Sequence, residues 1–366
     1  MKILLLQDRL RGGGTERQTV FLSRAFAARG HAVSLLTFRP GGTLTTELAG
    51  SAVVLRALQP FDTGLDWFAP GLVGAARAAA PDIILCMGRM ANCRAGQLQS
   101  ALPQAAVVAT VRTGKSLPWL YRRSLRTAHH VIANSEFARR TLVAPEGAAE
   151  HCTVIPNALL HSTLLDGGPS SPPNDDSREA LAPAPATADR PPVLLNVAQF
   201  RPEKNQRELL GIAATLPRGL PWKLAFVGDG PTRPACERQA AALGLTDRVA
   251  FHGWQADPTP FYRTAAIAVL TSQRESLPNF LVEAQCAGLP VVSYAVGGAG
   301  ECFHEGVTGY LIPAGDHARF TQTLAGLLSQ PERRATMAAA SQAWARVQFA
   351  PDRQIEAHLT LFERLL

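Results

Sequence analysis

Short apolar segments of strand length alternate with helix-like segments along most of this 366-residue chain. In the first half, the apolar runs occupy residues 2–6, 32–38, 83–86, 106–111 and 131–133. A turn or a helical stretch follows each run, and the first helix is expected from about residue 15 to residue 29. Strands that are apolar throughout and separated by helices are typical of a parallel sheet covered on both faces. The alternation therefore predicts a doubly wound α/β domain.

A change in composition interrupts this alternation. Between residues 166 and 192 the chain contains seven of its 27 prolines, together with much Gly, Ser, Ala and Asp. Such a segment has no apolar face to bury, so we expect a linker or a flexible loop. The alternation then resumes, with strands expected at 193–198, 224–227, 249–252, 267–271 and 291–294, and helices at 206–216, 233–243 and 278–287.

The last residues of the chain predict one more helix. Ile355, Leu359, Phe362 and Leu366 recur at helical spacing, which indicates an amphipathic helix. The expected organisation is an N-terminal Rossmann-like domain, a linker, a C-terminal Rossmann-like domain and this final helix, over residues 1–165, 166–192, 193–350 and 351–366. Two doubly wound parallel-sheet domains that face one another across a cleft account for the whole pattern.

The composition excludes several classes of protein. Hydrophobic residues make up 46% of the chain and charged residues 18%, which indicates a globular protein rather than a disordered or fibrous one. The six cysteines are far apart and form no C-x-x-C pair, so a disulfide scaffold and a zinc ribbon are excluded and a reducing compartment is favoured. No apolar stretch resembles a signal peptide or a membrane-spanning helix, so we expect a cytoplasmic protein.

Positive charge is concentrated in the first half of the chain. Residues 1–165 contain 18 Lys and Arg against nine Asp and Glu, whereas the remainder has a net charge of −2. This asymmetry suggests an anionic partner for the first half. The densest run, 118–126, places Trp119 beside Arg122 and Arg123, a composition suited to an anionic membrane surface. The alternative is a solvated helix with its aromatic side chains in the core. Nucleic acid is not expected, because no motif for binding it is present.

A glycine loop precedes the first expected helix. Gly13 and Gly14 follow a strand, so their backbone amides and the helix dipole are suited to a phosphate or an approaching substrate. The loop is not a dinucleotide-binding fingerprint, because its third glycine would fall on Arg17, and it lacks the G-K-[ST] of a Walker loop. The alternative is an ordinary turn between a strand and a helix.

Basic residues follow the first strand of the second half. Gln199, Arg201 and Lys204 come just after the carboxyl end of that strand, where ligands bind in open α/β sheets. Arg201 and Lys204 are suited to a diphosphate, although a structural salt bridge would also account for them. Gly228 follows the next strand and is interpreted either as a ligand contact or as part of an ordinary turn.

Two glutamates flank the start of a helix in the second half. Pro278 stands where a first helical turn begins, and the amides that follow it would form an anion site. Glu283 lies five residues along, roughly 7–8 Å at 1.5 Å per residue, which is the reach of a ribose whose diphosphate docks at the helix end. Glu275 precedes the helix and would face the group beyond the diphosphate. The alternative is that both glutamates are surface charges.

These motifs together resemble a known family. The E-x7-E pattern of Glu275 and Glu283 is followed by AGLPVV at 287–292, GGAGE at 297–301 and GVTGYL at 306–311. With them, residues 193–313 resemble the nucleotide-binding domain of retaining family 4 glycosyltransferases. The first half is similar in outline, through its glycine loop, the segment ANS at 133–135 and the segment VIPN at 154–157. The resemblance implies a GT-B fold, with the active site between two Rossmann-like domains and the final helix returning to the first.

The resemblance also implies a reaction. The donor would be a UDP- or GDP-linked sugar, transferred with retention of its anomeric configuration. Lys204 and Arg201 would neutralise the leaving diphosphate, Glu283 would hold the ribose, and Glu275 would contact the sugar. The donor nucleotide would also contact Gly13, Gly14, Gln199, Gly228, Gly253, Trp254, Leu277, Pro278, Asn279 and Phe280. No cofactor is implied, and because the sequence has no D-x-D triplet, no metal is expected on the diphosphate.

Two positions depart from the family pattern. Gln199 stands where the family usually has an arginine, so either Arg201 supplies that charge or the site carries less positive charge. Arg112 stands where many members have a histidine, and an arginine cannot act as a base near pH 7. Its role would be electrostatic or in acceptor binding, with Asn134 and Ser135 also on the acceptor side.

The sequence therefore predicts a retaining, metal-independent hexosyl- or N-acetylhexosaminyltransferase that acts on a saccharide or lipid-linked acceptor in the synthesis of cell-surface glycans. Such an enzyme would be cytoplasmic and peripheral on the inner face of the cytoplasmic membrane. Two alternatives stay open. One is a nucleotide-sugar epimerase or a phosphorylase on the same architecture, and the other is a non-catalytic module that binds polyanions.

Overall fold

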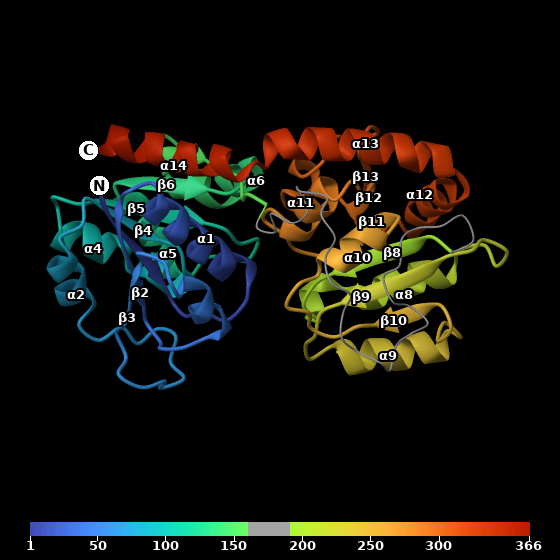
Figure 1. Ribbon diagram of the computed structural model, residues 1–366, viewed down its shortest axis with the longest axis horizontal. Coiled ribbons are helices and arrows are strands. Elements are labelled where there is room, and N and C mark those ends of the chain that lie inside the picture. The colour runs from blue at the N-terminus through green and yellow to red at the C-terminus, as the bar shows by residue number, and fades with distance from the viewer. Residues whose placement is uncertain (160–190) are drawn as a thin grey trace. The chain divides into compact units, whose positions relative to one another are not determined.

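The chain folds into two compact units, each built around its own parallel sheet (Figure 1). The computed structural model describes residues 1–159 and 191–366. The first unit comprises Met1–Leu160 together with Pro351–Leu366, and the second comprises His161–Ala350. Most of the expected linker, residues 166–190, lies outside the described residues.

The first sheet has seven parallel strands in the order β3-β2-β1-β4-β5-β6-β7. The strands are β1 Lys2–Gln7, β2 Ala32–Thr37, β3 Val54–Ala57, β4 Ile83–Cys86, β5 Ala106–Val111, β6 His130–Ala133 and β7 Cys152–Val154. Every residue of β4 and β5 is buried, as their unbroken apolar runs predict. The strand order reverses between β1 and β4, so the loops that follow these strands diverge and leave room for a ligand.

Helices cover both faces of this sheet. Leu4 and Leu6 of β1 belong to a core cluster with residues of α2 to α5, whereas Ile3 and Leu5 belong to another with residues of α1 and α14. The helices are α1 Gly14–Ala28, α2 Leu72–Ala79, α3 Arg89–Cys93, α4 Ala95–Ala101, α5 Trp119–Thr127, α6 Glu136–Ala138 and α14 Pro351–Leu365, with single turns at Thr43–Leu48, Arg139–Val143 and Ala144–Glu146. The alternation of side chains along β1 thus builds two separate layers of core.

The final helix, α14, packs in the first unit. Phe362 meets Phe26 of α1 edge to face, with ring centroids 5.7 Å apart. The side-chain amide of Gln354 donates to the carbonyl oxygen of Pro156 at 2.9 Å. Because Phe362 is fully buried, its packing stabilises this position of the helix by roughly 1.5–3 kcal/mol.

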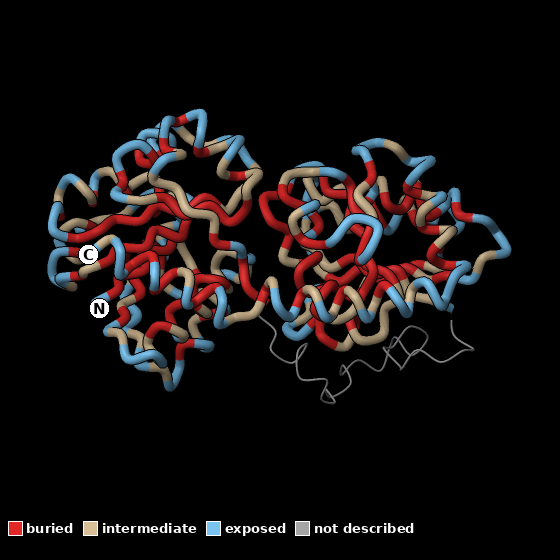
Figure 2. The backbone as a smooth tube through the Cα atoms, turned by 90° about the horizontal axis from the view of Figure 1, so that it is seen from above, coloured by how far each residue is buried: buried red, intermediate tan, exposed pale blue. Residues whose placement is uncertain are grey.

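The second sheet has six parallel strands in the order β10-β9-β8-β11-β12-β13. The strands are β8 Val193–Val197, β9 Lys223–Val227, β10 Val249–Phe251, β11 Ile267–Leu270, β12 Val291–Tyr294 and β13 Gly309–Ile312. The helices are α8 Gln206–Ala214, α9 Arg233–Ala242, α10 Thr259–Thr264, α11 Asn279–Cys286, α12 His317–Ser329 and α13 Pro331–Gln348, with single turns at Pro202–Lys204 and Ala299–Glu301. In both units the buried part of the backbone is concentrated in the sheet (Figure 2).

The predicted fold class is confirmed, since both sheets are parallel and lie in an α/β arrangement. Three strands and two long helices were not predicted. Val54 in β3 is 64% exposed at the edge of its sheet, so this strand lacks a continuous apolar run. Strand β7 has only three residues, and β13 begins with a glycine. Short edge strands carry too little apolar pattern to be detected from the sequence alone.

The basic run at residues 118–126 forms most of α5. Some of its residues pack or pair within the protein, and others contact solvent. Tyr121 is buried, whereas Trp119 and Leu120 are 67% and 46% exposed. Arg122 and Arg126 both donate to the buried carboxylate of Glu146, at 2.5 and 2.7 Å. Part of this charge therefore stabilises the fold, and the apolar side chains at the start of the helix contact solvent.

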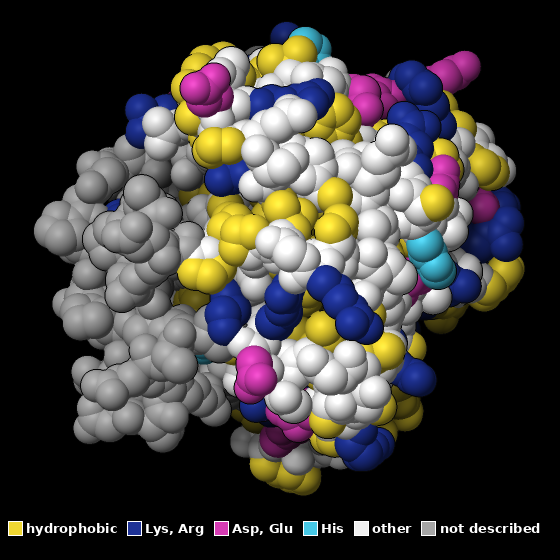
Figure 3. Space-filling model, turned by 90° about the vertical axis from the view of Figure 1, so that its right-hand side faces the viewer, with side chains coloured by type: hydrophobic (Ala, Val, Ile, Leu, Met, Phe, Trp, Pro, Cys, Tyr) yellow, Lys and Arg dark blue, Asp and Glu magenta, His cyan; other side chains and the backbone are white. Residues whose placement is uncertain are grey.

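Two further observations concern the length of the helices and the side chains at the surface. Within residues 1–159 and 191–366, every helix is too short or too polar to span a bilayer. On the face of the molecule shown in Figure 3, Lys and Arg side chains lie among hydrophobic and uncharged ones.

Candidate functional site

The loops that follow β8 and β9 approach each other closely at the carboxyl edge of the second sheet. Gly228 has a φ of +137°, and a Cβ at this position would come within 2.0 Å of the carbonyl oxygen of Ala198. The amide of Gly228 donates to the carbonyl oxygen of Gly253 at 2.7 Å. Gly228 is thus required for the fold of this edge. Trp254, which is 59% exposed, lies beside Gly253 after β10.

The predicted basic residues follow β8, and one of them is paired with a predicted glutamate. Gln199 and Arg201 are exposed, whereas Lys204 ends the single turn Pro202–Lys204. The ammonium group of Lys204 donates to Oε1 of Glu275 at 2.6 Å. The Glu275 side chain is 9% exposed and that of Lys204 is 27% exposed, so the pair is largely shielded from water. Two residues that sequence reasoning assigned to catalysis therefore meet.

Backbone contacts fix the turn that carries Lys204. Asn205 has a φ of +53°, a left-handed conformation that is uncommon outside glycine. Its carbonyl oxygen accepts from Oγ1 of Thr271 at 3.1 Å, and the amide of Gln273 donates to the carbonyl oxygen of Glu203 at 2.8 Å. These bonds tie the turn to the segment after β11, the neighbour of β8 in the sheet. The position of Lys204 is therefore set by backbone contacts as well as by its ion pair.

The E-x7-E motif spans the start of α11. Pro278 directly precedes the first helical residue, and Leu277 and Phe280 on either side of it are buried. The first amides of a helix have no acceptor within the helix, and the helix dipole favours an anion there. Glu275 and Glu283 are only 8% and 9% exposed, so the interpretation of both as surface charges is wrong.

Glu283 is held by a buried tyrosine. The hydroxyl of Tyr262 in α10 donates to Oε2 of Glu283 at 2.5 Å, and Tyr262 is fully buried. Burial raises the pKa of Tyr262 well above its ordinary value, and the charge of Glu283 raises it further. Tyr262 therefore stays protonated and acts as a hydrogen-bond donor. This bond fixes the carboxylate that is predicted to bind the ribose.

A glycine turn packs against the backbone of Glu275. Gly297 has a φ of +55°, and a Cβ there would lie 1.9 Å from the carbonyl oxygen of Glu275. The amide of Gly298 donates to the carbonyl oxygen of Ser276 at 2.9 Å. Both glycines belong to the GGAGE segment. That segment therefore positions the first glutamate of the motif through backbone contact.

The glycine loop of the first unit lies beside a cavity of about 310 Å³. Gly13 caps α1 and Gly14 is its first residue, and the two residues that follow line the cavity. Residues after β1, β4 and β5 also line it, among them Asp8, Gly88 and Arg112. The cavity thus lies at the carboxyl edge of the first sheet, where the strand order reverses.

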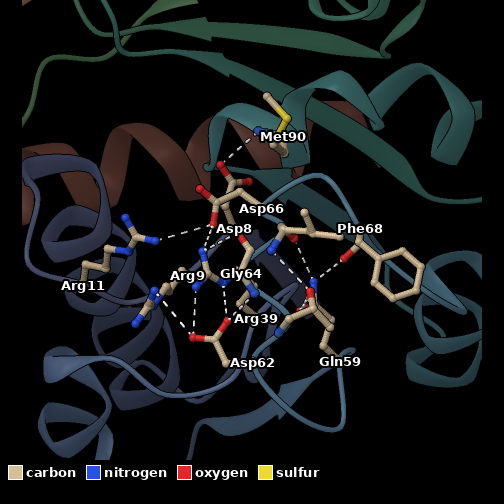
Figure 4. Close-up of polar contacts among 12 residues, drawn as sticks. Asp8, Arg9, Arg11, Arg39, Gln59, Asp62, Gly64, Asp66, Phe68 and Met90 are labelled. Atoms are coloured by element: carbon tan, nitrogen blue, oxygen red, sulfur yellow. Dashed lines mark hydrogen bonds and ion pairs between the residues drawn. The ribbon is translucent and has the colours of Figure 1, made fainter.

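Asp8 is an acid in this cavity that is held by backbone amides. Its carboxylate accepts from the amides of Met90 at 3.0 Å and Ala91 at 2.8 Å, and Figure 4 shows the first of these bonds. A Cβ at Gly88 would lie 2.2 Å from Oδ1 of Asp8, so this close approach needs a glycine. Burial raises the pKa of Asp8 to about 6, although the two amide bonds act in the opposite direction.

The residues predicted on the acceptor side occupy different environments. Arg112 lines the cavity, and its Nη1 donates to Oδ1 of Asn157 at 2.6 Å. Burial lowers the pKa of Arg112 to about 10, so the guanidinium still carries its charge at pH 7. Asn134 and Ser135 are buried and do not line the cavity, and Oγ of Ser135 accepts from the amide of Ala138 as a helix cap. The role of Asn134 and Ser135 toward an acceptor stays a prediction.

Sequence reasoning missed two residues of these sites. Asp8 directly follows the first strand, so the rule that selected Lys204 after β8 would also have found it. Tyr262 lies 21 residues before Glu283 in a short helix, and no local pattern indicates their contact. That contact depends on how two helices pack.

Replacement of Gly297 by alanine tests the glycine contact. The new Cβ would meet the Glu275 carbonyl oxygen at 1.9 Å in a left-handed conformation, and the combined strain should cost about 3 kcal/mol or more of unfolding free energy. Gly306 is the matched control, because it has a φ of +74° with nothing near its Cβ position, so Gly306→Ala should cost only about 1–2 kcal/mol. Urea unfolding measures both. Equal losses would contradict a role for the contact with Glu275.

Both halves of the chain match known families of proteins. Residues 177–344 match the family model described as glycosyl transferases group 1, and residues 12–159 match that of glycosyltransferase family 4. The Vi polysaccharide biosynthesis protein VipC/TviE of Salmonella typhi is 31% identical over 167 residues, which are 45% of this chain and 28% of that protein. The lipopolysaccharide core biosynthesis glycosyltransferase LpsE of Rhizobium meliloti is 29% identical over 170 residues, which are 46% and 49% of the two proteins. The chain thus spans less than half the length of either relative.

A solved structure shows the same fold across both units. The crystal structure of Anabaena HepE in complex with UDP has a TM-score of 0.80 to this chain, with 24% identity and coverage of 100% of both chains. The sheets of seven and six parallel strands match the GT-B arrangement of glycosyltransferases. The chain therefore has a GT-B fold, with residues 12–159 similar to glycosyltransferase family 4 and residues 177–344 similar to the glycosyl transferases of group 1.

Proposed function

We propose that the chain is a retaining, metal-independent glycosyltransferase. It transfers a hexosyl or N-acetylhexosaminyl group from a UDP- or GDP-sugar to a saccharide or lipid-linked acceptor in the synthesis of cell-surface glycans. The observation that carries the proposal is the ion pair of Lys204 and Glu275 in the motif that also contains Glu283, the carboxylate fixed by Tyr262.

Related proteins support the choice of substrates. Anabaena HepE is described in complexes with UDP, with UDP and glucose, and with UDP-glucose. The relatives from Salmonella typhi and Rhizobium meliloti are named for the biosynthesis of a polysaccharide and of a lipopolysaccharide core. A nucleotide sugar is therefore the favoured donor, and a saccharide the favoured acceptor.

The residues of the second unit suit stabilisation of the leaving group. When the bond between the anomeric carbon and the diphosphate oxygen breaks, its electron pair stays on the nucleoside diphosphate. Lys204, Arg201 and the first amides of α11 would meet that charge, and each such preorganised donor contributes about 10²–10³ in rate. The acceptor oxygen attacks the same face of the sugar, and its proton passes to the departing phosphate. This path needs no separate protein base.

The ion pair implies competition between Glu275 and the diphosphate for Lys204. In the free protein the carboxylate of Glu275 lies 2.6 Å from the ammonium group and offsets its charge. When a diphosphate takes that ammonium group, Glu275 is released to accept hydroxyl groups of the sugar. Binding of the donor would thus move Glu275 from a structural contact to a substrate contact.

Glu275→Gln and Lys204→Met distinguish these roles. Glu275→Gln removes a negative charge beside the diphosphate, so we expect UDP to bind at least as tightly as in the wild type. Transfer should nevertheless fall by about 100-fold or more, because the carboxylate contact to the sugar is lost. Lys204→Met should weaken UDP binding by roughly 10- to 100-fold, the effect of a lost charge-assisted hydrogen bond.

Isothermal titration with UDP measures the affinity, and NMR of the product reports transfer and the anomeric configuration. Weaker UDP binding in Glu275→Gln would contradict the competition. An inverted product would contradict retention. Epimerised sugar without acceptor would favour the epimerase alternative, and a wild-type protein that binds neither UDP nor GDP would favour the polyanion-binding module.

Tyr262→Phe tests the positioning of Glu283. Loss of the 2.5 Å bond removes the tyrosine donor that orients the carboxylate, so we expect donor KM to rise by roughly 10-fold, with a smaller change in kcat. Tyr294→Phe is the matched control, because Tyr294 is equally buried in the same unit and donates to Glu208 at 2.6 Å. Equal changes in KM for the two variants would show that Tyr262 acts through stability alone.

We further propose that the protein is cytoplasmic and binds the inner face of the membrane through the start of α5. Trp119 and Leu120 are exposed there, and the guanidinium of Arg123 lies 5.7 Å from the Trp119 ring centroid. An amphipathic surface of this kind is suited to anionic lipid headgroups.

Flotation with phosphatidylglycerol vesicles at low salt tests this surface. The double variant Trp119→Ser with Leu120→Ser should bind about 10-fold less tightly, because two apolar side chains no longer enter the interface. Leu243→Ser, at a residue that is 41% exposed in the second unit, should bind like the wild type. Absence of wild-type binding would remove the membrane proposal and leave the transferase proposal intact.

A further inference from the structure

The cavity of the first unit is lined by more cations than acids. Five basic residues line it against three acidic ones: Arg9, Arg11, Arg89, Arg112 and Lys115, against Asp8, Glu16 and Asp66. Its volume of about 310 Å³ is at the lower end of the range for small-molecule sites. The cavity therefore has the size and the charge for a small anionic group.

Two of the acids are already engaged by the protein. Asp66 accepts from Nη1 of Arg39 at 2.6 Å, and Nη2 of Arg11 lies 3.8 Å from the same oxygen. Asp8 accepts two backbone amides at the start of α3. Figure 4 shows Asp8 and Asp66 among these partners. Because hydrogen bonds and ion pairs offset their charges, these acids do little to neutralise the other cations of the cavity.

Within residues 1–159 and 191–366, two of the cations form hydrogen bonds to neutral oxygen atoms and to no carboxylate. Nη2 of Arg89 donates to the carbonyl oxygen of Ser116 at 3.1 Å, and Nη1 of Arg112 donates to the amide oxygen of Asn157 at 2.6 Å. Nε and Nη2 of Arg112 are buried and have no hydrogen-bond partner in the described part of the chain. A buried charge without a counter-charge is costly, so an arriving anion would be favoured here.

A fixed loop forms one wall of the cavity. The buried guanidinium of Arg39 binds both carboxylate oxygens of Asp62, at 2.6 and 2.9 Å, and the carbonyl oxygen of Gly64 at 3.2 Å. The side-chain amide of Gln59 donates to the carbonyl oxygen of Phe68 at 2.6 Å. These bonds hold the loop that carries Asp66 in one conformation (Figure 4). A preformed wall lowers the entropic cost of binding a ligand.

We propose that this cavity binds an oxyanion, a carboxylate or a phosphate, carried by the acceptor saccharide. The proposal rests on the proposed function and names the acceptor as an acidic or phosphorylated sugar. A phosphate of the donor has the same chemistry, so it is the competing source. The acceptor is favoured because the second unit already provides Lys204, Arg201 and the start of α11 for the diphosphate of the donor.

Arg89→Gln is the principal test, with Arg94→Gln as the matched control. Among the described residues, the Arg89 side chain forms a single hydrogen bond, to the carbonyl oxygen of Ser116, so its loss should disturb the fold little. Arg94 lies five residues later, contacts the side chain of Gln97 and does not line the cavity. Arg112→Gln is a second variant, which removes the buried guanidinium.

Binding of glucuronate, inorganic phosphate and glucose is measured by calorimetry with UDP at saturation, so that the donor site is occupied. The wild type and Arg94→Gln should bind glucuronate at least about 10-fold more tightly than glucose. Arg89→Gln and Arg112→Gln should lose most of this preference. Equal binding of glucuronate and glucose by the wild type would overturn the proposal, and so would a preference that survives in both variants.

The affinity for UDP separates the two sources of the anion. It should be the same in the wild type, Arg89→Gln and Arg112→Gln if the cavity serves the acceptor. A loss of UDP affinity of about 10-fold in these variants would assign the cavity to the donor and overturn the proposal. A wild type that binds no nucleotide would overturn the proposed function instead, while glucuronate binding measured without UDP would still support an anion site here.

Discussion

The ion pair between Lys204 and Glu275 organises the carboxyl edge of the second sheet. It joins the segments that follow β8 and β11, which are neighbours in the sheet. Salt screens a shielded pair of this kind only weakly, and loss of one partner leaves the other charge uncompensated in a poorly hydrated place. The resting protein therefore keeps each residue in position through the other. A ligand that supplies negative charge to Lys204 and hydroxyl groups to Glu275 can replace both contacts at once.

Glycines make this arrangement possible by letting backbones approach where side chains would collide. Gly297 lies against the carbonyl oxygen of Glu275, and Gly228 lies against that of Ala198. The acidic residue is thus held from its main chain, and its carboxylate is left to the ion pair. Sites supported in this way need little reorganisation when charge develops on a substrate. The GGAGE segment, which is also part of the family resemblance, therefore holds the backbone of Glu275 and Ser276 in place.

The sequence predicted most of the fold because its central strands are apolar throughout. Runs such as 83–86 and 106–111 coincide with β4 and β5, since strands buried on both faces show no polar alternation. Edge strand β3 was not predicted, because its side chains contact solvent and it therefore has no continuous apolar run. In the site, the spacing of Glu275 and Glu283 was visible in the sequence, because the two residues lie on either side of the start of one helix. The bond from Tyr262 to Glu283 was not, because it depends on the packing of α10 against α11 rather than on any local pattern.

The net positive charge of the first half does not by itself indicate where an anionic ligand binds. Much of it is offset in ion pairs: Arg39 binds Asp62 and Asp66, and Arg122 of α5 pairs with Glu146. Carboxylates thus hold several of the arginines that make the sequence basic. In the first unit, the cation best suited to attract an anion is one whose hydrogen-bond partners among the described residues are all neutral. Arg112 meets that condition at the carboxyl edge of the sheet, where its charge is kept despite burial.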